Sequence, residues 1–175
     1  ELLAEAAKIK PMIIGIDEVG RGAWAGPLVV GAVSLSKKIQ GLDDSKKLSP
    51  KLRTILAEKV HDQAEFVGIG WAESFEVDDY GLSAALTLAT LRALVGLDDK
   101  IEIIIDGNSN YLADYYPNSR CLIKADSLVP AVSSDSFVAK VARDQYMTNL
   151  SVKFPPYGFD SNVGYGTKFH RESII

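Results

Sequence analysis

Apolar residues in the first half of the chain gather in short runs bounded by turn residues, a pattern that predicts β-strands. Met12–Asp17 and Leu28–Leu35 are two such runs, and the glycine-rich bend Gly20–Gly26 between them predicts a hairpin with a longer loop. Glu65–Glu73 is rich in β-branched and aromatic residues and predicts a third strand, followed by a polar turn over Ser74–Gly81. The chain is therefore expected to begin in a sheet.

Longer segments carry apolar residues at helical spacing. A capping serine and a proline at the first helical position predict a helix from about Pro50 to Asp62. Leu82–Val95 is apolar on nearly all sides, which predicts a helix buried in the core, and Pro130–Leu150 predicts a long helix. The tail Phe154–Gly166 is rich in Gly, Pro and Tyr and predicts an ordered loop, with a final helix or its first turns in Thr167–Ile175.

Two later strands are each followed by an acidic residue. Ile101–Ile105 predicts an interior strand that stops at Asp106, and Arg120–Lys124 predicts another, with Asp126 in the connection to the next helix. Strands interspersed with helices favour an α/β fold with a mixed sheet, antiparallel at the start and parallel where helices intervene. At 175 residues we expect a single domain over residues 1–175.

Composition narrows the class of protein. No apolar stretch reaches the roughly 18 to 20 residues of a bilayer-spanning helix, so we expect no membrane segment and a cytoplasmic location. The only cysteine, Cys121, excludes an intrachain disulfide and a multi-cysteine zinc site, and we expect it to be buried. The formal charge of −4 argues against a large basic face that binds nucleic acid, although bound divalent cations would neutralise part of it.

Four carboxylates lie at strand ends or just beyond them: Asp17, Glu18, Asp106 and Asp126. Adjacent residues of a strand point to opposite faces, so Asp17 and Glu18 share one site only if the chain leaves the pleat near Gly20. Such a cluster repels itself unless it is neutralised, and hard oxygen ligands suit Mg²⁺ or Mn²⁺ rather than zinc. Each aspartate taken alone is also consistent with a simple turn or helix cap.

The segment around the first two acids has a specific likeness. Gly15-Ile16-Asp17-Glu18-Val19-Gly20-Arg21-Gly22, followed by Ala25-Gly26-Pro27-Leu28-Val29, resembles the N-terminal signature of ribonuclease HII, the type 2 ribonuclease H family. Five further blocks come in the family's order: Leu42–Ser49, Ile105–Asn108, Lys124–Asp126, Ala139–Asp144 and Gly164–Thr167. The matches run from about Ile13 to His170 and are hard to obtain by chance.

This resemblance implies a ribonuclease H-like fold and an endonuclease that hydrolyses the RNA strand of RNA·DNA hybrids. It also implies cuts on the 5′ side of a single ribonucleotide embedded in duplex DNA, which leave a 5′-phosphate and a 3′-hydroxyl. Asp17, Glu18, Asp106 and Asp126 match the family's metal-binding acids, which implies catalysis with two divalent ions, Mg²⁺ or Mn²⁺.

The resemblance also implies substrate contacts. Gly20-Arg21-Gly22 matches the triplet that approaches the 2′-hydroxyl, with Arg21 at the adjoining phosphate, and Tyr165 matches a tyrosine that stacks on the neighbouring deoxyribose. Lys46 and Lys47 are candidates for phosphate contacts. The alternatives are a tight turn with a solvated arginine, an ordinary half-buried tyrosine and a solvated lysine pair. We expect a monomer whose segment from about Phe154 contacts substrate.

Some features depart from the family or stay open. Ser133-Ser134-Asp135 stands where the family carries small apolar residues, and Ala125 stands for a family glycine, but neither change removes a ligand. We expect His61 on a helix surface, His170 near substrate, and Asp144 either behind the metal ligands or in a structural role linked to Arg143. The missing initiator Met and the end of the chain soon after His170 leave the natural termini open.

Two rival functions stay open on the sequence. The first is another two-metal nuclease of the same fold, such as an ordinary ribonuclease H that needs several consecutive ribonucleotides. The second is a non-catalytic protein that binds RNA·DNA hybrids. Cleavage of a DNA duplex that carries one ribonucleotide would distinguish a ribonuclease HII from an ordinary ribonuclease H. Binding without metal-dependent cleavage would support the non-catalytic protein.

Overall fold

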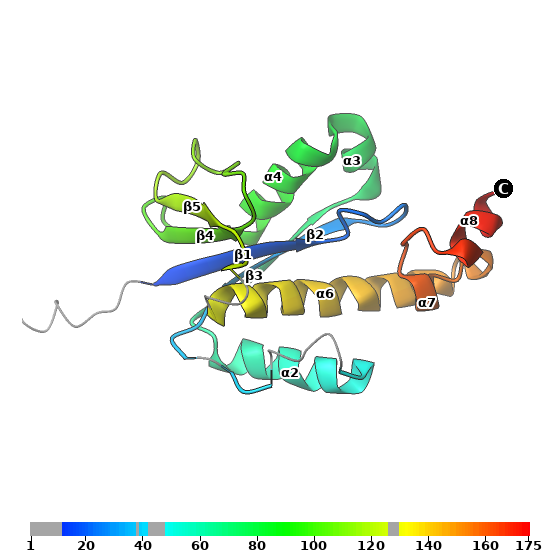
Figure 1. Ribbon diagram of the computed structural model, residues 1–175, viewed down its shortest axis with the longest axis horizontal. Helices are drawn as coiled ribbons and strands as arrows, with labels where there is room; N and C mark the ends of the chain where they lie inside the picture. Colours follow the sequence, from blue (N-terminus) through cyan, green and yellow to red (C-terminus); the bar gives the residue numbers. More distant parts are fainter. Residues whose placement is uncertain (1–11, 38, 42–47, 126–129) are drawn as a thin grey trace, which may run out of the picture.

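A five-stranded mixed sheet forms the centre of the protein, as a computed structural model that describes residues 12–37, 39–41, 48–125 and 130–175 shows (Figure 1). The strand order is β3-β2-β1-β4-β5. β1 pairs antiparallel with β2 and β2 antiparallel with β3, whereas β4 pairs parallel with both β1 and β5. This confirms the predicted mixed sheet. The strands are β1 (Ile13–Val19), β2 (Leu28–Ser34), β3 (Phe66–Ala72), β4 (Glu102–Asp106) and β5 (Ser119–Leu122).

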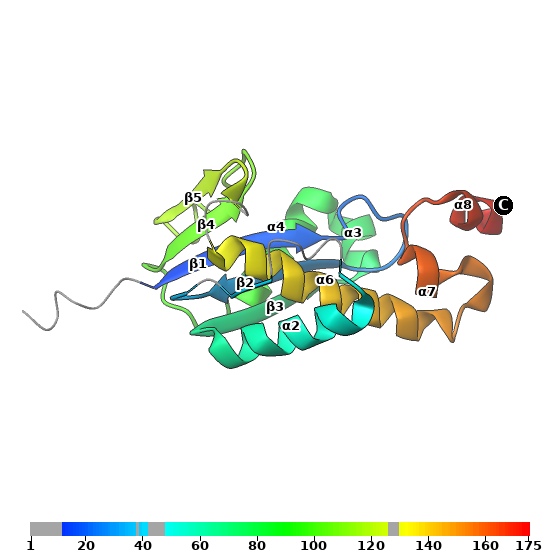
Figure 2. The same cartoon turned by 60° about the horizontal axis from the view of Figure 1, so that its bottom comes forward.

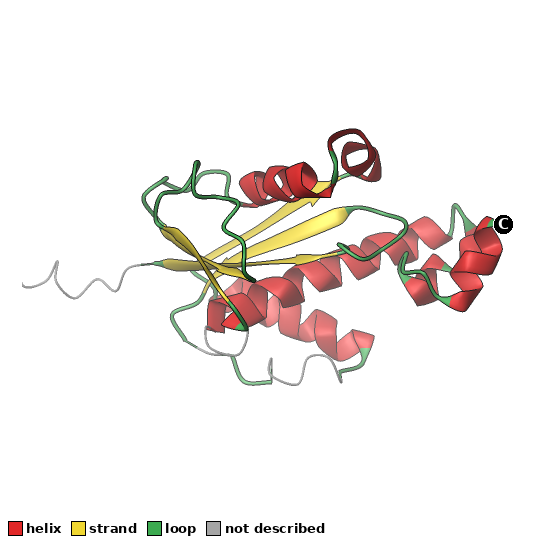
Figure 3. Cartoon of the chain, turned by 45° about the horizontal axis from the view of Figure 1, so that its top comes forward, coloured by secondary structure: helices red, strands yellow, loops and turns green. Residues whose placement is uncertain are grey.

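Helices cover both faces of the sheet. On one face α4 (Leu82–Ala93) packs on β2 and β3, and α3 (Ser74–Tyr80) packs on α4. On the other face α6 (Pro130–Ser151) crosses β1 and β2, with α2 (Pro50–Gln63) beside it (Figures 2 and 3). The tail adds η2 (Pro155–Tyr157), α7 (Phe159–Asn162) and α8 (Lys168–Ile174), which lie at the far end of α6. Within the described ranges, no helix has the length and apolar character to cross a bilayer.

The alternation of side chains along the strands builds two cores. Ile14 and Ile16 of β1 belong to the core beneath α4, whereas Val33 of β2 belongs to the core beneath α2 and α6. Gly68 and Gly70 of β3 let α4 approach closely, because a Cβ at either position would collide with a carbonyl oxygen of that helix. Burial of apolar side chains from both layers, at about 25 cal/mol per Å², is the main stabilising contribution.

Three sequence predictions need correction. The predicted polar turn Ser74–Gly81 is instead helix α3, and the predicted loop Phe154–Gly166 contains η2 and α7. The helix that begins at Leu82 is buried along one side only, through residues such as Ala85 and Ala89, while Leu82 itself is exposed. The final helix is confirmed as α8, and Cys121 is half-buried at the margin of the core beneath α4.

Two glutamates explain the missed helix. Glu73 and Glu76 form a reciprocal capping box in which the Glu76 carboxylate accepts a hydrogen bond of 2.9 Å from the Glu73 amide. The same carboxylate accepts two hydrogen bonds of 2.8 Å from Arg92 of α4, and Arg92 also donates to the Trp71 carbonyl of β3. These bonds with Arg92 are the main reason that the pKa of Glu76 falls from its ordinary value of 4.5 to about 2.

We expect Glu76→Gln to destabilise the protein at neutral pH and to lose this effect in acid. Because the pKa is lower in the folded state, the stabilisation is fully present above pH 4.5 and is lost as the pH falls toward about 2. Urea unfolding of both proteins at several pH values measures the difference, with Glu172→Gln on the exposed side of α8 as the control. A difference that stays constant from pH 7 to about 2 would contradict the expectation.

Candidate active site

The carboxyl ends of β1 and β4 bring two of the candidate acids together. The last pair in the parallel register is Ile16 with Ile105, and the next residue of each strand is an aspartate, Asp17 or Asp106. Parallel strands end at the same edge of a sheet, where the sites of α/β proteins collect. The structure therefore places these two aspartates side by side, as the sequence predicted.

The strand pleat sets the direction of each acid. Ile16 and Ile105 belong to the core beneath α4, so Asp17 and Asp106 project toward the opposite face, where α6 lies. Glu18 follows Ile16 by two positions and lies on the α4 side. The sheet ladder continues through Val19, so the chain leaves the pleat only at Gly20, whose φ is +96°. Asp17 and Glu18 therefore reach the sheet edge from opposite faces.

A pocket of about 170 Å³ lies at this edge, lined in part by Ser83 and Leu86 of α4. Glu18 and Asp106 both line it, together with Arg21 and Asn108. The Arg21 guanidinium lies 3.2 Å from the Glu18 carboxylate, and the arginine side chain is 64% exposed. A carboxylate pair beside an exposed cation is thus open to a polar ligand.

Backbone amides orient two of the aspartates. Asp17 Oδ1 accepts a hydrogen bond of 2.8 Å from the Glu18 amide, and Asp106 Oδ1 accepts one of 2.9 Å from the Ala125 amide. Ala125 is buried and directly precedes Asp126 in the sequence. Asp106 is therefore bound to Ala125, the residue that precedes the fourth candidate acid in the sequence. Asp126, Lys46 and Lys47 themselves lie outside the described residues, and so do their predicted roles.

The described acids fit a divalent cation in chemistry but do not complete a site. Carboxylate oxygens are the ligands that Mg²⁺ and Mn²⁺ prefer. Within residues 12–37, 39–41, 48–125 and 130–175, no three His, Cys, Asp or Glu side chains form a group that could hold a metal ion. The described part of the centre is the pair Glu18 and Asp106 in one pocket, with Asp17 beside Asp106.

The Gly20-Arg21-Gly22 loop and the C-terminal tail meet next to these acids. A Cβ on Gly22 would lie 4.0 Å from Cε1 of Tyr165, so the loop and the tyrosine are neighbours. The amides of Trp24 and Ala25 donate to the Gly164 carbonyl at 2.8 and 3.2 Å. The structure thus brings together Tyr165 and the Gly20-Arg21-Gly22 triplet, for which the family resemblance implies substrate contacts.

Arg143 of α6 links the loop to the tail. Its contribution to the site was not predicted from the sequence. Its side chain is 0% exposed and donates hydrogen bonds to the carbonyls of Pro27 and Ala25 in the loop and of Val163 in the tail. Its guanidinium lies 5.5 Å from the centre of the Tyr165 ring. Burial lowers the pKa of Arg143. Its place in the block Ala139–Asp144 was the only signal in the sequence.

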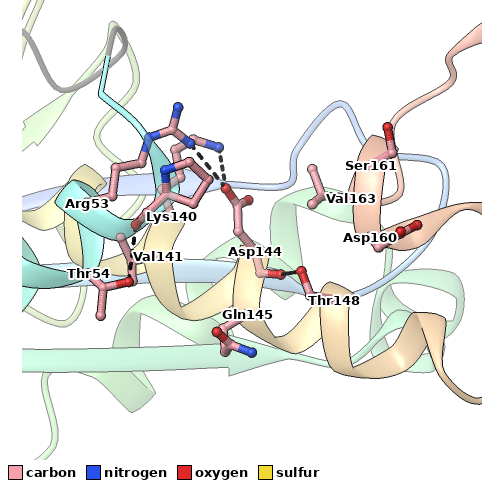
Figure 4. Close-up of a pocket in the computed structure, with 11 residues that line it drawn as sticks. Arg53, Thr54, Lys140, Val141, Asp144, Gln145, Thr148, Asp160, Ser161 and Val163 are labelled. Carbon is pink, nitrogen blue, oxygen red and sulfur yellow. Dashed lines mark hydrogen bonds and ion pairs between the residues drawn. The ribbon is translucent and has the colours of Figure 1, made fainter.

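Asp144 lies in a different pocket, of about 330 Å³, between α2, α6 and the tail (Figure 4). Its carboxylate points toward Lys140, at 2.8 Å, and Arg53, at 3.8 Å. Neither partner is one of the candidate metal ligands. The structural alternative for Asp144 is therefore favoured, as a link between α2 and α6, and its charge also acts on Arg143.

The two histidines also separate clearly. His61 is exposed on α2, as predicted. His170 is only 1% exposed, because the rings of Tyr157 and Phe159 pack edge-on against it. The prediction that its side chain contacts substrate is therefore wrong. Its Nδ1 lies 2.9 Å from the Tyr165 carbonyl oxygen. His170 therefore supports the backbone that carries Tyr165.

Comparison with known proteins gives one consistent result. The family model for ribonuclease HII matches residues 14–175. Ribonuclease HII of Shewanella halifaxensis is 42% identical over 163 residues, which cover 91% of this chain and 79% of the relative. That of Wolbachia sp. subsp. Brugia malayi is 42% identical over 171 residues, with 95% and 83% covered.

Solved structures agree with these relatives. Ribonuclease HII from Archaeoglobus fulgidus, determined in a complex with PCNA, superimposes with a TM-score of 0.79 at 28% identity, covering 93% of this chain and 86% of that one. Ribonuclease H2 from Pyrococcus horikoshii has a TM-score of 0.76 at 26% identity, with 93% and 84% covered. The order of the strands, the acids at their ends and these matches together show that the chain belongs to the ribonuclease HII family.

Proposed function

We propose that this protein cuts the RNA strand of RNA·DNA hybrids at a pair of divalent ions held by Asp17, Glu18, Asp106 and Asp126. The observation that carries the proposal is the parallel register of β1 and β4, which sets Asp17 beside Asp106 at the sheet edge. Glu18 joins them through the pocket it shares with Asp106. Membership of the ribonuclease HII family supports a hydrolase that acts on such hybrids.

The acids supply the ligands for this chemistry. These acids would hold a pair of Mg²⁺ or Mn²⁺ ions, which would supply activation of the attacking water and charge stabilisation at the leaving 3′ oxygen. Asp106 commits one oxygen to the Ala125 amide, which fixes the carboxylate and leaves its second oxygen as a ligand. Asp126, which follows Ala125, supplies the fourth carboxylate in this proposal. The reaction needs no protein nucleophile and leaves a 5′-phosphate and a 3′-hydroxyl.

Selection of the ribonucleotide belongs to the Gly20-Arg21-Gly22 loop and Tyr165. Glycine backbone can approach a 2′-hydroxyl closely, and the exposed Arg21 is available to a phosphate next to it. The closeness of Gly22 and Tyr165 supports one shared subsite for the ribonucleotide and the sugar that follows it. Lys46 and Lys47 would add phosphate contacts. We also propose a monomer built as one domain and, from its single cysteine, a cytoplasmic setting.

A DNA duplex that carries one ribonucleotide tests this function. With Mg²⁺ or Mn²⁺ we expect a cut on the 5′ side of the ribonucleotide, and without divalent ions none. An ordinary ribonuclease H would leave this duplex intact and cut only a hybrid with several ribonucleotides, which serves as the comparison substrate. Binding of both duplexes without cleavage in any divalent ion would favour a non-catalytic protein instead.

A further inference from the structure

Trp24 is a large aromatic residue that the fold leaves exposed next to the proposed subsite. It is 61% exposed and lies in the loop between Gly22 and β2. Large exposed aromatic surfaces in folded proteins are often interaction sites, because their burial on binding releases water from apolar area. Phe75, Tyr80 and Phe169 are exposed to a similar extent, so the surroundings of Trp24, rather than its exposure alone, argue for a partner.

The indole is held in place. The Trp24 amide donates to the Gly164 carbonyl at 2.8 Å, which fixes the backbone. A Cβ on Gly166 would lie 2.6 Å from Cε2 of the indole, so the ring rests against the backbone of Gly166. Its centre is 6.4 Å from that of the buried His170 ring. One side of the ring is thus packed on the tail, and the rest faces solvent. Because the ring is already held, binding a ligand there costs little side-chain conformational entropy.

The surroundings of Trp24 suit a nucleic-acid backbone. Tyr165 lies between Gly164 and Gly166, two residues that Trp24 contacts, so both aromatic residues lie where the loop meets the tail. Two exposed cations flank this surface in the sequence, each in an ion pair: Arg21 with Glu18, at 3.2 Å and 64% exposed, and Lys168 with Glu172, at 3.8 Å and 82% exposed. Aromatic rings beside cations are typical of surfaces that bind sugar-phosphate backbones. Ion pairs of exposed arginine or lysine are weak in water, so a phosphate can compete for these two cations.

We infer that Trp24 is a further substrate-contacting residue, whose indole packs on the sugar-phosphate backbone of the DNA side of the RNA-to-DNA junction. The inference rests on the proposed function, because it extends the Tyr165 subsite by a neighbouring nucleotide. A deoxyribose has no 2′-hydroxyl and offers an apolar edge to the ring, while the indole N–H can donate to a phosphate oxygen. Trp24 thereby favours a deoxynucleotide at this position.

Trp24 fluorescence tests the contact without relying on cleavage. The chain has two tryptophans, so Trp71→Phe leaves Trp24 as the only indole. We expect its emission to change as the protein is titrated with the single-ribonucleotide duplex in EDTA, in step with the fluorescence anisotropy of a labelled duplex. Anisotropy that reports binding while the Trp24 emission stays constant would overturn the inference.

A substitution tests the energetic contribution. We expect Trp24→Leu to raise KM by roughly 10-fold with kcat changed less than about twofold, since loss of one aromatic stacking contact weakens nucleic-acid binding to this degree. Trp24→Phe should recover much of the loss. The matched control is Tyr115→Leu, an aromatic residue 52% exposed in the connection that precedes the edge strand β5. Equal KM values for wild type and Trp24→Leu would also overturn the inference.

Two outcomes keep the inference distinct from the proposed function. If the wild-type protein neither binds nor cuts the duplex, the proposed function fails and the inference fails with it. A second outcome is that the wild-type protein binds and cuts, but Trp24→Leu lowers the unfolding midpoint as well as raising KM. If the Trp24 emission of the Trp71→Phe protein also stays constant on binding, Trp24 is a structural support of Tyr165. In that case the inference alone is overturned.

Discussion

Asp106→Asn abolishes cleavage and leaves the fold intact, in our expectation. Asn keeps an oxygen for the hydrogen bond from the Ala125 amide, so the local structure survives. It loses the negative charge that a divalent cation requires from its ligand. Since a bound metal contributes several kcal/mol of transition-state stabilisation, the rate should fall by about 1,000-fold or more.

The measurement is single-turnover cleavage of the hybrid at saturating Mg²⁺, together with urea unfolding to verify the fold. Glu102→Gln is the matched control, because it makes the same change from carboxylate to amide at the other end of β4. Glu102 pairs there with Arg120 on the surface, far from the carboxyl edge. Full activity of Asp106→Asn would rule out this residue as a required ligand.

Arg143→Met should have the largest effect on stability. Methionine keeps most of the volume of the side chain but removes every donor, so the carbonyls of Pro27, Ala25 and Val163 lose their partner. An unsatisfied buried acceptor costs about 1 to 3 kcal/mol, and removal of a buried charge offsets part of the sum. We therefore expect a loss of about 3 kcal/mol in the free energy of unfolding.

Urea unfolding monitored by circular dichroism measures this loss. Arg120→Met is the comparison, because its guanidinium forms an exposed pair with Glu102 and such pairs contribute only about 0 to 1 kcal/mol. Arg143→Met should also raise KM, since Tyr165 and the Gly20-Arg21-Gly22 loop lose their common anchor. Equal stability losses in the two variants would show that the buried guanidinium has no special role.

Most of the strand and helix pattern was predictable because it depends on local periodicity. The runs at β1 and β4 are short, β-branched and end in acids, so the strand ends and the approximate place of Asp17 and Asp106 followed from the sequence. Helix α3 was missed because Glu73 caps it in place of the usual serine, threonine, aspartate or asparagine. Its apolar content is also too low to give a helical period.

The tertiary partners of the site were not predictable. His170 stands alone in the sequence, and only folding surrounds it with Tyr157, Phe159 and Trp24. In the sequence Arg143 is one more charged residue on a helix. Only in the folded protein do carbonyls of two distant segments accept its hydrogen bonds. Such burial arises from contacts between residues far apart in the chain, which no local pattern encodes.

The central place of β1 has a consequence for synthesis of the protein. Its antiparallel partner β2 follows after a short loop, but its parallel partner β4 emerges only after α2, β3, α3 and α4 have been made. Until then the other edge of β1, with Ile14 and Ile16, offers unpaired amides and apolar side chains to any passing strand. Pairing of β4 with β1 therefore removes an edge that is open to aggregation, and it also brings Asp106 beside Asp17.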